Sequence, residues 1–115
     1  MDEVAGDWVD VAGLAELPDG KLTRVTLGDA SVLLVKAGDE LFAVDSRCTH
    51  QAAALDRGVL RISGSLATVT CPSHGSMFDL RTGRVMRPPA AKPVSVYDVI
   101  EDRGRVYLRP RGGAT

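Results

Sequence analysis

The sequence predicts an all-β domain, because apolar and polar residues alternate along most of its short segments. Turn residues separate these segments every eight to twelve positions, as in domains built from short strands. No stretch keeps a helical period over three turns, and neither a repeat nor a linker is visible. The 115 residues therefore predict one domain over residues 1–109, followed by a flexible tail over residues 110–115.

The expected elements of the first half are strands, and proline or glycine marks the turns between them. In order, they are strands at 8–11, 21–27, 31–36 and 41–45, with a turn at 17–20. The strand at 31–36 is almost continuously apolar, which predicts that it is buried. We expect it to form a β-hairpin with the strand at 41–45.

The second half continues the same pattern around two loops. The expected elements are a helical turn at 52–55, strands at 59–62 and 66–70, a tight hairpin at 79–85, a proline-rich loop at 88–93, and strands at 94–100 and 105–108. Gly58 follows the helical turn too soon for a longer helix. The second half therefore also predicts paired strands joined by short turns.

All the cysteines and histidines of the chain lie in two short boxes, residues 48–50 and residues 71–79. Cysteine and histidine are the usual ligands of soft and borderline metals, so two matched pairs predict a metal centre. In an extended loop, residues i and i+2 point the same way, so Cys48 and His50 can face one site. Cys71 and His74 are spaced one residue further apart.

The pattern Cys-x-His followed by Cys-x-x-His resembles the ligand pattern of the Rieske [2Fe–2S] family, and the resemblance extends to residue 83. It implies one [2Fe–2S] cluster, with Cys48 and Cys71 on one iron and His50 and His74 on the other. It also implies a Rieske-like fold of three antiparallel sheets, in which two loops form the cluster-binding tip. The histidines would then lie outermost, at the surface.

Two departures indicate the soluble, low-potential ferredoxin branch of the family, the type found in ring-hydroxylating dioxygenase systems. High-potential members carry extra loop cysteines, where this chain has residues 51–53 and Ser73, and they carry a membrane anchor. The resemblance therefore implies a monomeric one-electron carrier that is not itself an enzyme. It would take electrons from a flavoprotein reductase and pass them to a terminal oxygenase, by transient docking at the His50/His74 tip.

Five further residues are expected to lie around the cluster: Gly75, Ser76, Met77, Phe78 and Pro88. Ser76 matches a serine that hydrogen-bonds the cluster region in high-potential members, whereas Phe78 replaces a tyrosine. A solvent-facing hydroxyl is an equally good interpretation of Ser76. For Met77 and Pro88, the alternative is ordinary loop packing.

The formal net charge of −1 hides a separation of charge along the chain. Residues 1–46 carry ten acidic and three basic side chains, whereas residues 47–115 carry five acidic and eleven basic ones. Such a separation can orient diffusional encounters, and Arg81, Arg84 and Arg87 are candidates for steering an acidic partner. Charges on solvated strand faces are an equally good explanation of this separation of charge. The scarcity of aromatics and of dense basic runs predicts no nucleic-acid partner.

No apolar run approaches the ~18 residues of a membrane span, and no secretory signal follows the acidic N-terminus. Thiols held by a metal suit a reducing compartment, so we expect a cytoplasmic protein without a membrane partner. Two alternatives remain open. The chain could be the Rieske small subunit of a larger enzyme, such as an NADH-dependent nitrite reductase. It could also be a zinc-stabilised binding module, although zinc fingers usually open with two cysteines.

Overall fold

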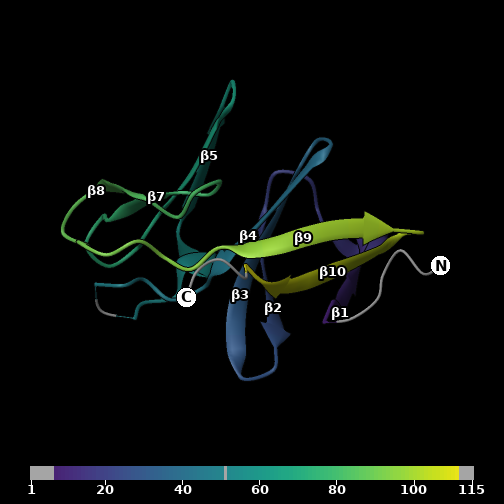
Figure 1. The fold of residues 1–115 in the computed structure, drawn as a ribbon. Coiled ribbons are helices and arrows are strands. Elements are labelled where there is room, and N and C mark those ends of the chain that lie inside the picture. The colour runs from purple at the N-terminus through teal and green to yellow at the C-terminus, as the bar shows by residue number, and fades with distance from the viewer. Residues whose placement is uncertain (1–6, 51, 112–115) are drawn as a thin grey trace.

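The computed structural model describes residues 7–50 and 52–111. In this part of the chain, ten strands and two 3₁₀ turns follow one another (Figure 1). The elements are β1 (Val9–Gly13), η1 (Leu14–Glu16), β2 (Leu22–Leu27), β3 (Ala30–Ala37), β4 (Glu40–Asp45), η2 (Leu55–Arg57), β5 (Val59–Ser63), β6 (Leu66–Thr70), β7 (Met77–Asp79), β8 (Val85–Arg87), β9 (Tyr97–Asp102) and β10 (Arg105–Pro110).

The strands form three antiparallel sheets, with the orders β1-β10-β9, β2-β3-β4 and β5-β6-β7-β8. The predicted all-β class and the three-sheet architecture are therefore confirmed. Figure 1 shows β7, β8 and their loops at one end of the molecule and the turn between β9 and β10 at the other. The two cysteine-histidine boxes follow β4 and β6, at the end that carries β7 and β8.

The central sheet is buried on both of its faces, which explains the continuous apolar run in β3. Leu33 and Val35 face a larger core that β6 and β7 complete. Val32 and Leu34 face a smaller core, which β9 and β10 cover. All four side chains have no exposed surface. Because successive side chains of a strand point to opposite faces, a strand between two cores needs apolar residues at every position.

Most predicted strands are confirmed, including the hairpins of β3 with β4, β5 with β6, and β9 with β10. The helical turn expected at 52–55 lies at Leu55–Arg57 instead, because Ala52 has a positive φ of 58° and Ala54 is extended. Small residues in a row do not reveal such a backbone. No helix in the described part of the chain is long and apolar enough to cross a membrane.

The strand expected at 94–100 begins only at Tyr97, because the residues before it pair with loops and a neighbouring strand end. The Val94 amide donates to the Gly83 carbonyl, and the Ser95 carbonyl accepts from the Asp45 amide. At the C-terminus, β10 includes Pro110. The flexible tail expected over 110–115 stays a prediction, and residues 112–115 lie outside the described residues.

Gly83 joins the β7–β8 turn to the loop that follows β8. Its amide donates to the Asp79 carbonyl at 2.7 Å, and its own carbonyl accepts from the Val94 amide at 3.0 Å. Its φ is 78°, in the left-handed region, and a Cβ there would overlap the Val94 carbonyl oxygen. Only glycine satisfies both conditions without moving backbone.

We therefore expect Gly83→Ala to lower the free energy of unfolding by about 3 kcal/mol, as the sum of left-handed strain and overpacking. The matched control is Gly64→Ala in the β5–β6 turn, where φ is 60° and a Cβ would contact nothing within 4 Å. Gly64→Ala should lower the free energy of unfolding by only about 1 kcal/mol, because it adds backbone strain but no overlap. Urea unfolding measures both, and equal losses would contradict the argument.

Candidate metal centre

The first box lies in a loop that closes on the backbone of its cysteine. The Cys48 amide donates to the Ala53 carbonyl at 2.9 Å, and the Cys48 carbonyl accepts from the Ala52 amide at 2.7 Å. At the base of the loop, the Leu55 amide donates to the Ser46 carbonyl at 2.7 Å. These bonds fix the position of Cys48 relative to the end of β4, because each one pairs a buried or partly buried backbone group.

The second box repeats this arrangement around its own cysteine. The Cys71 amide donates to the Ser76 carbonyl at 2.7 Å, and the Cys71 carbonyl accepts from the Gly75 amide at 3.2 Å. In both loops the partners lie four and five residues after the cysteine, and the fourth residue has a positive φ. The φ of Gly75 is 81°, in the left-handed region that glycine adopts without strain. Ala52 takes the same place in the first loop.

The four predicted ligands divide into two buried thiols and two exposed imidazoles. Cys48 and Cys71 are each only 3% exposed and belong to the larger core. His50 and His74 are exposed, and their ring centroids lie 5.3 Å apart with the rings at 89° to each other. The fold thus brings the two loops together, with sulfur donors inside and nitrogen donors at the surface.

This donor set fits a two-iron cluster. A [2Fe–2S] group needs two thiolates on one iron and, in the Rieske type, two imidazoles on the other. Here both cysteines belong to one core cluster, and the two imidazoles lie close together at the surface. A zinc ion would need all four donors to converge on one point. Within residues 7–50 and 52–111, no three His, Cys, Asp or Glu side chains are grouped closely enough to hold a single metal ion.

A third loop, residues 88–93, contacts both boxes. The Ala90 amide donates to the Ser76 hydroxyl at 2.9 Å, and the Thr49 hydroxyl donates to the Lys92 carbonyl at 2.6 Å. Sequence reasoning named Pro88 in this loop and missed Ala90, Lys92 and Thr49. The three prolines of the loop predicted an irregular segment, but no local pattern shows which box such a segment touches.

The other residues expected near the cluster have different environments. Ser76 has no exposed surface, so the solvent-facing interpretation of its hydroxyl is wrong. Phe78 is fully buried in the larger core, Met77 is half-buried in β7, and Pro88 is exposed. Contact of Gly75 and these four residues with a cluster stays a prediction.

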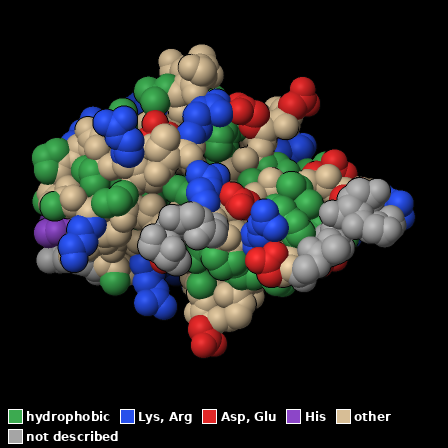
Figure 2. All heavy atoms as spheres, in the orientation of Figure 1, with side chains coloured by type: hydrophobic (Ala, Val, Ile, Leu, Met, Phe, Trp, Pro, Cys, Tyr) green, Lys and Arg blue, Asp and Glu red, His purple; other side chains and the backbone are tan. Residues whose placement is uncertain are grey.

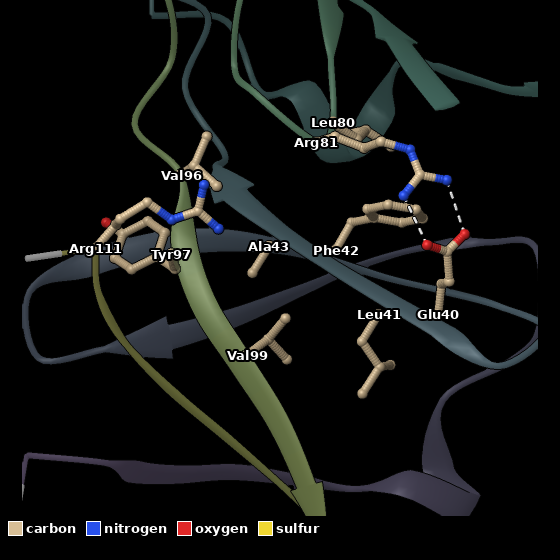
Figure 3. A pocket seen from close by; sticks show the side chains of 10 residues that line it. All are labelled: Glu40, Leu41, Phe42, Ala43, Leu80, Arg81, Val96, Tyr97, Val99 and Arg111. Atoms are coloured by element: carbon tan, nitrogen blue, oxygen red, sulfur yellow. Dashed lines mark hydrogen bonds and ion pairs between the residues drawn. The ribbon is translucent and has the colours of Figure 1, made fainter. Parts of the chain in front are cut away.

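Arg81 joins two sheets, so it is not free to steer a partner as the sequence suggested. Its guanidinium donates to both carboxylate oxygens of Glu40 at 2.6 and 2.8 Å and to the Ser65 carbonyl at 2.8 Å. The guanidinium carbon also lies 5.0 Å from the centroid of the Phe42 ring (Figure 3). Because Arg81 follows β7 and Glu40 begins β4, this ion pair ties the sheet of the boxes to the central sheet.

A cavity of about 190 Å³ lies beside this ion pair (Figure 3). It is lined by Glu40, Leu41, Phe42, Ala43, Leu80, Arg81, Val96, Tyr97, Val99 and Arg111. Burial raises the pKa of the Tyr97 hydroxyl, and the Asp45 carboxylate adds to this shift. None of the four box cysteines and histidines lines the cavity, which belongs to the junction between the sheets.

The sequence matches the family described as Rieske [2Fe-2S] domain over residues 7–98. The chain therefore belongs to the Rieske [2Fe–2S] domain family, as the two boxes predicted. It is 38% identical over 98 residues to the 3-phenylpropionate/cinnamic acid dioxygenase ferredoxin subunit of Photorhabdus laumondii, covering 85% of this chain and 90% of the relative. The resemblance to the ferredoxin components of dioxygenase systems is confirmed.

Solved structures agree with this placement. The ferredoxin of carbazole 1,9a-dioxygenase from Nocardioides aromaticivorans IC177 is 33% identical, with a TM-score of 0.85 over 92% of this chain and 100% of its own. A ferredoxin in complex with the oxygenase of carbazole 1,9a-dioxygenase is 30% identical, with a TM-score of 0.77 over 90% and 94% of the two chains. A protein from Mycobacterium tuberculosis, named an NADH-dependent nitrite reductase small subunit, is 26% identical, with a TM-score of 0.77 over 88% and 92%.

The Glu40–Arg81 ion pair predicts a pH dependence of stability. Hydrogen bonding from Arg81 lowers the pKa of the Glu40 carboxyl below its ordinary value of 4.5. A group with a lowered pKa stabilises the folded state above its unfolded-state pKa, and this contribution is lost as the pH falls through the folded-state value. We expect Glu40→Gln to be less stable than the parent protein at neutral pH, with a difference that shrinks below about pH 4.5.

Thermal unfolding of both proteins between pH 3 and pH 7 measures this effect. Asp39→Asn is the matched control, because it removes the neighbouring carboxylate, which Arg81 does not contact. A difference between Glu40→Gln and the parent protein that stays constant with pH would contradict the prediction.

Proposed function

We propose that the protein is a one-electron carrier that holds one Rieske-type [2Fe–2S] cluster through Cys48, Cys71, His50 and His74. The observation that carries the proposal is the division of the site into two buried thiols below two adjacent, exposed imidazoles. When bound, such a cluster accepts and returns a single electron. The protein then needs no substrate pocket of its own, because its task is to hold the group and present it.

The residues around the two boxes fix the ligands and keep water away from the thiols. The backbone of each cysteine is held by two hydrogen bonds, so little rearrangement is needed when the thiolates bind a metal. Leu55 and Phe78, both without exposed surface, belong to the same core as the thiols. Neutral imidazoles in place of anionic thiolates ease reduction, so such centres span roughly −150 to +300 mV against about −400 mV for plant-type ferredoxins.

The partners we propose are a flavoprotein reductase as the electron donor and a terminal oxygenase as the acceptor. The names of the relatives support a place in a dioxygenase system, and a similar ferredoxin has been seen in complex with an oxygenase. Each partner would dock transiently at the tip that exposes His50 and His74. We further propose a monomer that works in the cytoplasm.

A second candidate function is that of a Rieske small subunit in a nitrite reductase. The similarity to the Mycobacterium tuberculosis protein favours it, although the identity there is lower than to the dioxygenase ferredoxins. Purification of the tagged protein from its native host separates the two functions. A free carrier elutes alone, whereas a subunit elutes with a large catalytic chain.

For the cofactor, we expect the protein purified without oxygen to contain two iron atoms and two acid-labile sulfides per chain. Reduction should consume one electron per chain and give an electron paramagnetic resonance signal with a low average g value. Cys48→Ser should lose iron and sulfide, because serine supplies a poorer donor for iron in this set. Ser73→Ala, an exposed position in the second box, should keep both.

Zinc in place of iron in the parent protein, or full iron content in Cys48→Ser, would refute the proposed centre. A cluster that forms but is not reduced by any NADH-dependent flavoprotein reductase and does not support an oxygenase would refute the carrier role alone.

Ser76 gives a prediction for the reduction potential. Its hydroxyl accepts a hydrogen bond from the Ala90 amide, which leaves the hydroxyl hydrogen free for another acceptor, and we propose that this acceptor is the cluster. Loss of the hydrogen bond from the Ser76 hydroxyl should destabilise the reduced, more negative state of the cluster by roughly 1 kcal/mol. Ser76→Ala should therefore lower the reduction potential by a few tens of millivolts. The loss of a partner for the buried Ala90 amide should also cost about 1–3 kcal/mol of stability.

Redox titration of Ser76→Ala, with Ser73→Ala as the control that removes an exposed hydroxyl from the same box, measures the shift. If Ser76→Ala is less stable but its potential is unchanged, then Ser76 only holds the third loop, and its expected role at the cluster is wrong.

A further inference from the structure

Positive charge gathers on the part of the chain that carries the two boxes. Between residues 47 and 92, six basic side chains are exposed and none is paired with a carboxylate of the described residues. They are Arg47, Arg57, Arg61, Arg84, Arg87 and Lys92. The acidic side chains in the same stretch, Asp56 and Asp79, are both partly buried and accept hydrogen bonds from neutral groups. The surface of this segment is therefore strongly basic.

Three of these basic residues lie in or directly beside the segments that form the tip. Arg47 precedes Cys48 and pairs with Ala54 across the base of the first loop. Arg87, at the end of β8, is the strand partner of Met77 in the second box. Lys92 lies in the third loop, held at its carbonyl by Thr49. One exposed cation thus precedes the first box, one ends the strand that pairs with the second box, and one lies in the third loop.

Apolar side chains are exposed among these cations. Met86 is 46% exposed, and the other exposed apolar residues near the boxes are Ala52, Pro72, Pro88, Pro89 and Ala91. Figure 2 shows basic and hydrophobic side chains around a histidine at one end of the molecule. In the same view, the acidic side chains lie mostly away from that end. We call the histidines, Arg47, Arg87, Lys92 and these apolar residues the basic tip.

We propose that the basic tip docks into a socket of a redox-partner protein that is apolar at its centre and lined with aspartate and glutamate. This inference rests on the proposed carrier function and specifies the chemistry of the partner. Opposite charges attract the partner over several ångströms and orient the tip toward it. The apolar residues then exclude water next to the imidazoles, and a small contact of this kind releases quickly, as a carrier requires.

Nucleic acid, the other common polyanion, fits this surface less well. Binding to single strands uses exposed aromatic side chains on which the bases stack. Here Phe42, Phe78 and Tyr97 are buried, and Trp8 and Tyr107 are half-buried. The basic tip offers charge and aliphatic surface, which suits an acidic protein socket.

Inorganic oxidants of opposite charge test the field at the tip. The reduced protein gives one electron to hexacyanoferrate(III), an anion, or to hexaamminecobalt(III), a cation, and stopped-flow absorbance follows the loss of the reduced state. Raising the ionic strength from about 0.01 M to about 1 M shortens the screening length from ~30 Å to ~3 Å. Over this range we expect the rate with the anion to fall about tenfold and the rate with the cation to rise.

Charge reversal locates the effect. Lys92→Glu and Arg87→Glu should each reduce the salt dependence with hexacyanoferrate(III) by at least about half. The matched control is Arg103→Glu, which makes the same change of charge in the exposed β9–β10 turn, at the opposite end of the molecule (Figure 1). It should leave the rates and their salt dependence unchanged. An equal effect of all three variants would overturn the inference, because it would show a response to net charge.

The class of partner is tested by binding. A short fluorescein-labelled oligoglutamate peptide should bind the parent protein and Arg103→Glu, and should bind Lys92→Glu at least about fivefold more weakly, as judged by fluorescence anisotropy. An oligolysine peptide should bind no more weakly to Lys92→Glu than to the parent protein. Labelled single-stranded DNA that binds the tip as tightly as oligoglutamate would overturn the choice of an acidic protein.

These measurements separate the inference from the proposed function. A protein that holds its cluster and reacts with both oxidants, yet shows no opposite salt dependence, overturns the acidic socket and leaves the carrier role intact. A protein without iron and sulfide overturns the proposed function. In that case, oligoglutamate binding by the parent protein and its loss in Lys92→Glu still decide whether the tip recognises acidic polypeptides.

Discussion

The burial of two cysteine side chains in the larger hydrophobic core is the constraint on which the rest of the structure depends. Cys48 and Cys71 must reach that core from loops that begin at the ends of β4 and β6, so both loops emerge at the same end of the molecule. The core in turn exists because β3, in the central sheet, is apolar on both faces. The position of the candidate metal centre is therefore set by the packing of the sheets.

The spacing within each box places the imidazoles on the opposite side of the site from the thiols. His50 and His74 follow their cysteines by two and three residues, before each loop returns through a residue with positive φ. The thiols thus lie among apolar side chains, while the imidazoles lie at the surface, close to each other and with their rings nearly perpendicular. A redox group held across this boundary is protected on one side and accessible to a partner on the other.

The arginines of the box-carrying half of the chain serve different purposes. Arg81 is bound by Glu40, by the Ser65 carbonyl and by the face of Phe42, so it holds two sheets together. Arg87 and other basic side chains nearby are exposed instead. Of the basic residues in this half of the chain, some therefore hold the fold together and others leave positive charge on the surface. The sequence does not distinguish the two kinds, because it does not show which side chains are paired.

Most strands, their hairpins and the four candidate ligands could be predicted from the sequence, because alternation, turn residues and box spacing are local properties of the chain. The burial of Ser76, the ion pair of Arg81 with Glu40 and the hydrogen bond from Thr49 to the third loop could not be predicted in this way. The two residues of that ion pair lie 41 positions apart, and Thr49 and Lys92 lie 43 apart. No local period or composition encodes contacts between such distant residues, since they arise only when separate sheets pack together.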